Sequence, residues 1–190
     1  MIIPNFLRPK IDEIFFRSKT EHLILKIKQF LSPGDKILDL GSGIGMFSHI
    51  LQEQGYQVTP IDVKDKSLYP RVRPLIYNGK KLPFADHSFD VCLLLSVLHH
   101  TQNPEVILKE AKRVAKKIII SENVYHNAIQ KHYTRFIDSL LNLEFFHHPH
   151  SNRTDKQWRE TFKRLDLTLI SLEYYRTFRW ISNVIYYVKT

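Results

Sequence analysis

The sequence predicts an α/β fold in which helices cover both faces of a mostly parallel sheet. Short apolar segments, each too short for a helix, alternate with amphipathic helical segments through most of the chain. Two β-rich segments then close the chain with no helix of normal length between them, which predicts an antiparallel pair. A chain of 190 residues is the size of one domain, and it is long enough to bury a sizeable core.

The predicted helices are placed by periodic apolar positions and by capping residues. Five apolar side chains fall on one side of residues 20–31, and Ser32, Pro33 and Gly34 end that pattern. Asn103 supplies an N-cap before a proline at the first helical position, and Thr154 caps a later helix. In chain order, helices are expected over residues 20–31, 45–54, 104–116, 125–143 and 154–165.

The predicted strands are short apolar runs bounded by turn residues. In chain order, strands are expected over residues 36–40, 57–62, 74–77, 91–95, 118–121, 167–174 and 184–188. Pro60 lies inside the second strand and cannot donate to a ladder, which predicts a bulge or an irregular end there. Cys92 lies in the fourth strand, where a small buried hydrophobe is favoured over a reactive thiol.

Composition and charge exclude several classes of protein. The net charge is +9, but no run of five or more Lys or Arg occurs, which excludes a dedicated basic tail while helping anionic partners approach. A single cysteine excludes an intramolecular disulfide and a Cys-rich zinc site. No apolar run approaches the ~20 residues of a membrane span, and no secretion signal is visible. A cytoplasmic protein is therefore expected.

The most informative stretch is the glycine-rich segment after the first predicted strand. Gly41, Gly43 and Gly45 follow one another at a spacing of two, between the end of a strand and the start of a helix. Glycine permits positive φ and close approach of the backbone to a ligand, so this loop is typical of a cofactor site at the carboxyl edge of a sheet. A plain glycine-rich turn is the alternative.

Two kinds of cofactor compete for this loop. A dinucleotide site has the spacing G-x-G-x-x-G, and here the third glycine comes one residue early. Asp39, just before the loop, would repel a pyrophosphate but favour a cationic amino group, which suits an amino-acid-bearing cofactor better. Asp62 ends the second strand about 20 residues beyond Gly41, where an acid can accept both hydroxyls of a ribose.

At this point the sequence resembles the class I S-adenosylmethionine-dependent methyltransferases, and within them the small-molecule branch that includes the ubiquinone and menaquinone biosynthesis methyltransferases. The resemblance covers roughly residues 20–190, and it is carried by Ile37–Phe47, Asp62, Asn78–Asp90, Leu95–His100 and Trp158–Phe162. It implies a single Rossmann-like domain over residues 1–190: a three-layer sandwich whose seven-stranded sheet is mostly parallel, with an antiparallel C-terminal pair. Residues 1–31 would form an N-terminal helical region, and residues 123–153 a substrate-cap insertion.

The resemblance implies S-adenosylmethionine as the cofactor and gives a role to particular residues. Asp39 would hold the methionine ammonium, Asp62 would bind the ribose, and Ser96 would line the methionine side of the pocket. Asn78 and Gly79 would meet the adenine edge. The implied cofactor-binding residues are Asp39, Gly41, Ser42, Gly43, Gly45, Asp62, Val63, Asn78, Gly79 and Ser96.

Four features depart from the family's usual pattern. Asn78 stands where the family usually has Asp, so an amide with both a donor and an acceptor would meet the adenine. Pro60 takes a position where Gly is commoner. The segment 63–74 is short and contains two prolines, which predicts that the helix after Asp62 is truncated. Residues 115–117 replace the usual Pro-Gly-Gly turn before the fifth strand.

The implied reaction needs few catalytic side chains. The sulfonium cofactor is already activated, so the protein chiefly orients an acceptor in line with the methyl group. A base is required only if the acceptor arrives protonated. His99 and His100 are the candidates for that role, with a positional hydrogen-bonding role as the alternative. Tyr125 and His126 are candidates to grip substrate, against an ordinary helix start.

No metal site is expected. His147, His148 and His150 lie close together in the sequence, but adjacent histidines rarely converge on one ion without carboxylate support. A polar loop is the favoured interpretation of this stretch.

The acceptor is expected to be a small or lipid-like molecule bound by residues 5–20, 123–153 and 174–183. Aromatic side chains alternate with arginines there, which suits an aromatic or anionic acceptor; ordinary core aromatics beside a solvated rim are the alternative. RNA methylation is a rival function favoured by the charge of +9, although the Asn/Asp-Pro-Pro-Tyr signature is missing. A second rival is a non-catalytic binding or assembly subunit, against which the glycine loop and Asp62 argue.

Overall fold

The computed structural model describes residues 8–125, 130, 132, 151–177 and 181–190. Within them the strands form one seven-stranded sheet in the order β3-β2-β1-β4-β5-β7-β6. All neighbouring pairs from β3 to β5 are parallel, and β7 is antiparallel to both β5 and β6. The strands are β1 (Lys36–Leu40), β2 (Gln57–Asp62), β3 (Leu75–Ile76), β4 (Phe89–Leu95), β5 (Ala115–Val124), β6 (Thr168–Thr177) and β7 (Ile181–Lys189).

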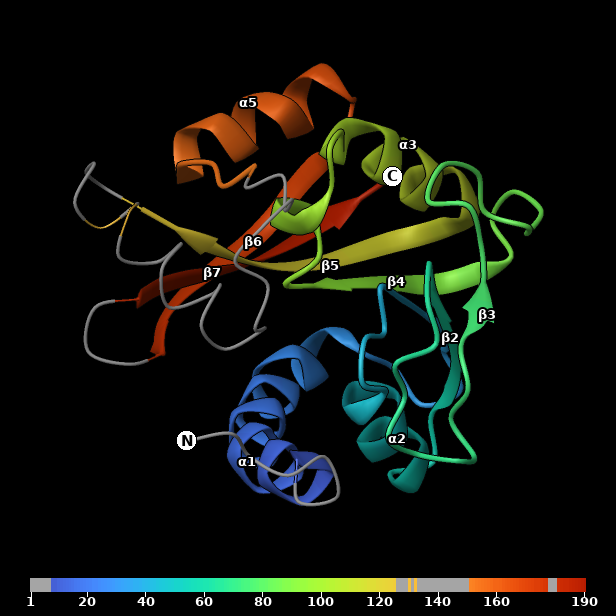
Figure 1. Cartoon of the computed structure of the whole chain (residues 1–190). Helices are drawn as coiled ribbons and strands as arrows, with labels where there is room; N and C mark the ends of the chain where they lie inside the picture. The colour runs from blue at the N-terminus through green and yellow to red at the C-terminus, as the bar shows by residue number, and fades with distance from the viewer. Residues whose placement is uncertain (1–7, 126–129, 131, 133–150, 178–180) are drawn as a thin grey trace.

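Helices cover both faces of this sheet. Figure 1 shows α1 and α2 on one face and α3 and α5 on the other, so the predicted three-layer, mostly parallel fold with an antiparallel C-terminal pair is confirmed. The helical elements are α1 (Arg8–Ile27), η1 (Lys28–Phe30), α2 (Met46–Glu53), η2 (Leu98–His100), α3 (Pro104–Val114) and α5 (Asp155–Arg164). None of the helices in the described part of the chain is long and apolar enough to cross a membrane.

The predicted capping residues begin α3 and α5. The Asn103 side chain accepts a hydrogen bond from the backbone N–H of Glu105. Thr154 and Gln157 form a reciprocal capping box at the start of α5. The first helix begins at Arg8, well before the predicted start at residue 20, and the predicted apolar positions Leu23, Ile24 and Ile27 are buried in the core. Most of the predicted helix over 125–143, His126 and the histidines of the 147–150 stretch lie outside the described residues, whereas Tyr125 is described and lies just after β5.

All seven predicted strands are present, but the later strands are longer than predicted, β5 and β7 most of all. The strand expected over 118–121 is longer, because β5 pairs with β7 from Lys117 to Val124. The irregularity expected at Pro60 is wrong, since β2 pairs with β1 in continuous register through Asp39 and Pro60. β3 pairs only with Ile61 and Asp62, so Pro60 has a strand neighbour on one side only, where a missing N–H is tolerated.

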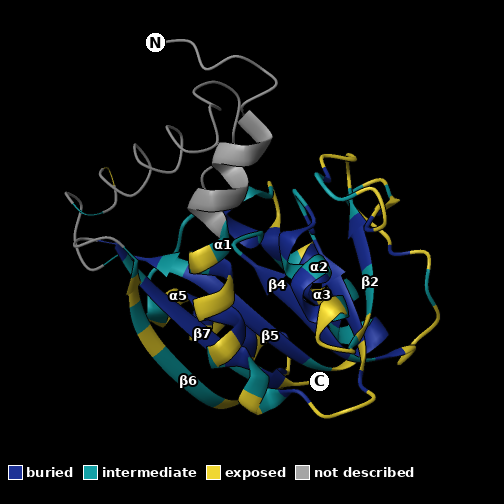
Figure 2. Cartoon of the chain, turned by 90° about the horizontal axis from the view of Figure 1, so that it is seen from below, coloured by how far each residue is buried: buried dark blue, intermediate teal, exposed yellow. Residues whose placement is uncertain are grey.

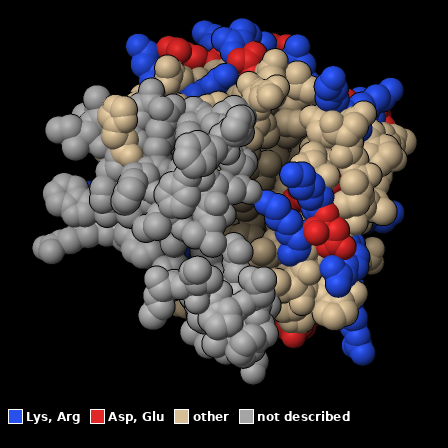
Figure 3. Space-filling model, in the orientation of Figure 1, with Lys and Arg blue, Asp and Glu red and all other residues tan. Residues whose placement is uncertain are grey.

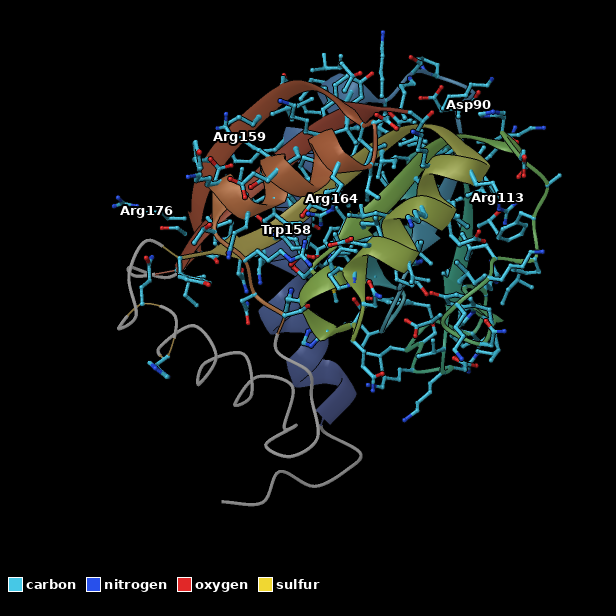
Figure 4. All side chains as sticks on the ribbon, turned by 90° about the horizontal axis from the view of Figure 1, so that it is seen from above. Asp90, Arg113, Trp158, Arg159, Arg164 and Arg176 are labelled. Carbon is cyan, nitrogen blue, oxygen red and sulfur yellow. The ribbon has the colours of Figure 1, made fainter. Side chains whose placement is uncertain are left out.

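The core consists of two apolar clusters, one on each face of the sheet. On one face Leu23, Ile24 and Ile27 of α1 pack with α2 and the central strands. On the other face Trp158 of α5 packs in the core with no exposed surface, and Figure 4 shows its place beside α5 from above. Cys92 is fully buried in this second cluster, and burial raises the pKa of its thiol. Figure 2 shows the central strands as the most buried part of the molecule.

The connection between β2 and β3 contains no helix. Residues 63–74 run as bends and turns, as the two prolines in this segment predict. The short connection leaves this end of the sheet covered mainly by loops (Figure 1).

Candidate functional site

The residues assigned to the cofactor meet at one edge of the sheet. Because β1, β2 and β4 are parallel neighbours, their carboxyl ends lie at the same edge. This edge brings together the loop 41–45 after β1, Asp62 at the end of β2 and Ser96 after β4. Three segments separated in sequence therefore form one candidate site.

The loop after β1 is held to β2 by its backbone. Gly41 and Ser42 donate their N–H groups to the carbonyl oxygen of Ile61, at 2.8 and 3.2 Å. Gly43 donates its N–H to Oδ2 of Asp62 at 2.8 Å. The loop and the acid predicted to hold the ribose thus form one hydrogen-bonded unit.

The three glycines of this loop all have positive φ, but they differ in the atoms that surround them. A Cβ added at Gly41 would lie 2.6 Å from a methyl group of Val97, and one added at Gly45 would lie 2.6 Å from the hydroxyl of Ser67. A Cβ at Gly43 would meet no atom within 4 Å. The outer glycines therefore permit close packing inside the protein, whereas the middle glycine borders open space that a ligand can occupy.

The carboxylate of Asp62 is oriented by backbone donors. The N–H of Val63 lies 2.6 Å from Oδ1, and Gly43 binds Oδ2. These contacts fix the carboxylate beside the open space at Gly43 and leave acceptor capacity on Oδ2. This arrangement fits a ligand with vicinal hydroxyls.

Asp39 is a buried carboxylate near the end of β1, just before the glycine loop. It is 2% exposed, and it accepts a hydrogen bond from the hydroxyl of Ser48 on α2 at 2.7 Å. Burial raises the pKa of Asp39 to about 6, and the nearby charge of Asp62 acts in the same direction. A cationic group brought close to this carboxylate would oppose both effects, so the site fits a ligand with an ammonium group.

Ser42 adds a further polar group to the loop. Its hydroxyl oxygen is buried and has no hydrogen-bond partner among the described residues. Leaving a buried hydroxyl unpaired costs about 1–3 kcal/mol. A polar ligand atom beside the loop would remove that cost, so this residue also fits a bound cofactor.

The residues predicted at the adenine edge lie next to the acid. Oδ1 of Asn78 accepts the backbone N–H groups of Lys80 and Lys81, at 2.9 and 3.1 Å. A Cβ added at Gly79 would lie 3.3 Å from Val63, so the two segments touch. The structure thereby brings Val63, Asn78 and Gly79 together, while their contacts with adenine stay a prediction.

The two predicted histidines lie side by side after β4, and His99 is buried while His100 is partly exposed. Nδ1 of His99 lies 2.5 Å from Oε2 of Glu122, and both side chains are at most 1% exposed. The rings of His99 and His100 are 4.0 Å apart. This geometry favours a positional hydrogen-bonding role for His99. A base role for either histidine stays a prediction.

Sequence analysis missed Glu122. This residue lies on β5, and its carboxylate also accepts the N–H groups of Val97 and Leu98. The available signal was a single carboxylate that follows a run of apolar strand residues. Because charged residues are almost never fully buried unless paired, that pattern could have indicated a buried polar contact.

A cavity of about 310 Å³ lies at the same edge of the sheet, at the end of β6 and the start of β7. Ser182 on β7 pairs with Val124 at the end of β5, which places this cavity beside the carboxyl end of β5. The hydroxyls of Ser121 and Tyr175 lie 2.8 Å apart nearby, and Arg176 projects outward from β6 (Figure 4). The lining residues are Tyr174, Tyr175, Arg176 and Ser182. The described residues contain no group of three or more His, Cys, Asp or Glu side chains that could hold a metal ion.

The mostly parallel sheet and the glycine loop after its first strand are typical of the Rossmann-like folds that bind nucleotide cofactors. Comparison with known proteins shows which domain this chain is similar to. Residues 38–118 match the family model described as a methyltransferase domain. The chain is 32% identical over 94 residues to a ubiquinone biosynthesis O-methyltransferase of Idiomarina loihiensis, a match that spans 44% of this chain and 39% of the relative. It is 32% identical over 99 residues to a demethylmenaquinone methyltransferase of Streptomyces griseus, across 47% and 43% of the two chains.

A solved structure shares the fold over most of the chain. A crystal structure from Methanosarcina mazei, described as a SAM-dependent methyltransferase, is 22% identical with a TM-score of 0.69. The match covers 86% of this chain and 96% of that one. The family model and the curated relatives confirm the resemblance to methyltransferases, and the solved structure confirms the shared fold. The matches to the two curated relatives span only about two fifths of their length.

Proposed function

We propose that the chain is an S-adenosylmethionine-dependent methyltransferase that transfers a methyl group to a small-molecule or lipid-like acceptor by in-line displacement. The observation that carries this proposal is the joined unit of Gly43 and Asp62. The N–H of Gly43 binds the Asp62 carboxylate, and open space lies beside the glycine. The match of residues 38–118 to the methyltransferase domain model supports the same function. We also propose a cytoplasmic location.

Different residues of the site would bind different parts of the cofactor. Asp62 would hold the ribose hydroxyls, Asp39 would stabilise the ammonium group, and Asn78 would meet the adenine with its amide. When bound, the cofactor supplies a methyl group attached to a positively charged sulfur, and the sulfur is a good leaving group because it departs as a neutral thioether. Orienting an acceptor in line with that group provides on the order of 7–11 kcal/mol of the rate enhancement.

The acceptor would bind beside the carboxyl end of β5. The cavity at β6 and β7 is lined in part by Tyr175 and Ser182, and the exposed Arg176 lies beside them, which suits an aromatic or anionic molecule. Tyr175 binds the hydroxyl of Ser121, and burial raises its pKa to about 12, so its phenol stays protonated and acts as a hydrogen-bonding group. The relatives named for quinone biosynthesis favour a small molecule.

RNA is a second candidate acceptor because of a basic segment next to the site. Residues 63–81 carry six exposed basic side chains, and Asp65, the exposed acid among them, pairs with Arg73 at 3.1 Å. Figure 3 shows Lys and Arg side chains beside the hollow on this side of the molecule. The basic residues are Lys64, Lys66, Arg71, Arg73, Lys80 and Lys81. Tight RNA binding that weakens steeply with salt would favour this candidate.

Replacing the acid at the end of β2 tests the cofactor site. Asp62→Ala should weaken binding of S-adenosylhomocysteine at least 100-fold in calorimetry and leave the circular dichroism spectrum unchanged. The matched control is Asp86→Ala, which removes an exposed carboxylate paired with Arg113. Affinity like that of the wild type in Asp62→Ala would contradict the site. A wild-type protein that binds no cofactor would favour a non-catalytic subunit.

The acceptor can be sought directly. The protein is incubated with methyl-labelled S-adenosylmethionine and a cell extract, and small molecules, lipids and RNA are separated before mass spectrometry. We expect the label in the small-molecule or lipid fraction of the wild-type reaction and its absence with Asp62→Ala. Label confined to RNA would instead support the second candidate.

A further inference from the structure

We propose that Glu122 is a positioning residue that holds the loop after β4 against the glycine loop and so keeps the cofactor site in its binding shape. This inference rests on the proposed function. Among the described residues, the hydrogen-bond partners of the Glu122 side chain are not assigned to the cofactor, and two of them are the backbone N–H groups of Val97 and Leu98.

The carboxylate of Glu122 gathers three donors from one short segment. Oε1 accepts the N–H of Val97 at 3.0 Å and that of Leu98 at 2.7 Å. Oε2 lies 2.5 Å from Nδ1 of His99, and the Glu122 side chain has no exposed surface. Hydrogen bonds to a charged group in such a dry environment are stronger than those between neutral groups. The carboxylate therefore fixes three consecutive residues.

The segment held in this way has a backbone that needs support. Ser96 has a φ of 60°, in the left-handed region that a residue with a side chain rarely adopts. Its N–H donates to the carbonyl oxygen of Ser121 at 2.8 Å, so the strand that carries Glu122 also fixes the start of the turn. A strained turn persists only where its surroundings determine it. The hydrogen bonds from Val97 and Leu98 to Glu122 hold the turn on the side that follows Ser96.

Val97 connects this turn to the cofactor loop. A Cβ added at Gly41 would lie 2.6 and 2.8 Å from the two methyl groups of Val97, so the valine rests directly on the glycine. On its other side Gly41 is bonded to Ile61. The loop 41–45 is thus held between β2 and Val97, and a displaced Val97 would release one side of it.

The same segment also anchors the chain that leads into α5. The carbonyl oxygen of His99 accepts the N–H of Ser151 at 3.1 Å, and the hydroxyl of Ser151 donates to the carbonyl oxygen of Leu98 at 2.8 Å. The cluster around Glu122 therefore joins the cofactor loop to the end of the predicted substrate-cap insertion over 123–153.

Glu122→Gln tests this role, because glutamine keeps the size and shape of the side chain but removes the negative charge that strengthens the hydrogen bonds to the segment after Ser96. We expect the dissociation constant for S-adenosylhomocysteine to rise at least tenfold. The amide NMR signals of Gly41 and Gly43 should shift in the cofactor-free variant. A change in stability alone would not move these two readouts together.

The matched control is Asp90→Asn, at the opposite edge of the sheet (Figure 4). Asp90 also accepts a backbone N–H, that of Lys36 at 3.0 Å, and pairs with Lys116 at 2.8 Å. This variant should leave the dissociation constant within twofold of the wild type and the two glycine signals in place.

The outcomes separate the inference from the proposed function. A wild-type protein that binds no cofactor contradicts the proposed function. A wild-type protein that binds, together with a folded Glu122→Gln variant of equal affinity, overturns the positioning role. If Glu122→Gln does not fold, Val97→Ala decides the question. Weaker binding in that variant supports the role, and unchanged binding overturns it.

Discussion

The loops after β1 and β4 reach the same edge of the sheet in different ways. The loop after β1 uses glycines at the positions of positive φ, and backbone hydrogen bonds to Ile61 hold it. The loop after β4 has Ser96 in the left-handed region and is held by the buried carboxylate of Glu122. Backbone freedom thus shapes one loop and a side chain from a neighbouring strand shapes the other. The two loops meet where Val97 rests on Gly41.

The contact between the two loops gives the largest expected effect. In Gly41→Ala the new methyl group would lie 2.6 Å from Val97, and the residue would keep a φ of 82°. We expect the free energy of unfolding to fall by about 3–4 kcal/mol, measured by urea denaturation, because overpacking and left-handed strain add. Adding Val97→Ala should restore part of the loss. Full stability in Gly41→Ala alone would show that the loops do not press on each other.

The buried acid below the first loop predicts a pH dependence. The pKa of Asp39 is raised from 3.8 to about 6 in the folded protein, so between these values the unfolded chain binds fewer protons. Stability should therefore fall as pH rises through about 4 to 6, by at most about 3 kcal/mol. Asp39→Asn should lack this slope, so its stability relative to the wild type should be higher at pH 7 than at pH 4. Parallel curves for the two proteins would contradict the raised pKa.

Substitutions at the middle glycine test whether the open space beside it is where the ligand binds. Gly43→Ala meets no neighbouring atom, so it should cost about 1 kcal/mol of stability through its φ of 54°. Calorimetry should show at least tenfold weaker binding of S-adenosylhomocysteine, and the bulkier Gly43→Val should weaken it further. The control is Gly34→Ala, which has a φ of 87° and equally open surroundings before β1. If both alanine variants bind alike, the space beside Gly43 is not the cofactor site.

The smallest effect is expected in the second loop. Ser96→Gly relieves the left-handed strain but increases the freedom of the unfolded chain, and the two effects nearly cancel. We expect the free energy of unfolding to change by less than about 0.5 kcal/mol in urea denaturation. A loss of several kcal/mol would show that the serine side chain, and not its backbone shape, is what the turn requires.

The sequence allowed the first loop and its partner Asp62 to be predicted, whereas in the second loop it indicated Ser96, His99 and His100 but not the carboxylate that holds them. Gly41, Gly43, Gly45 and Asp62 stand in a local pattern whose spacing follows from strand, turn and helix, and the structure joins them as one unit. Glu122 acts across 25 residues on the backbone of Val97, a contact that no local pattern encodes. Non-local pairing also explains the length of β5, which β7 extends, and the regular geometry at Pro60.

The central position of Cys92 has a practical consequence. It is the single cysteine of the chain, and its side chain is fully buried in β4, between β1 and β5. A thiol reagent can reach it only when the middle of the sheet opens. The rate of thiol labelling would therefore report how often the sheet opens, with no engineered probe. Ligands that bind the folded protein should lower this rate, and they could be ranked by how much they lower it.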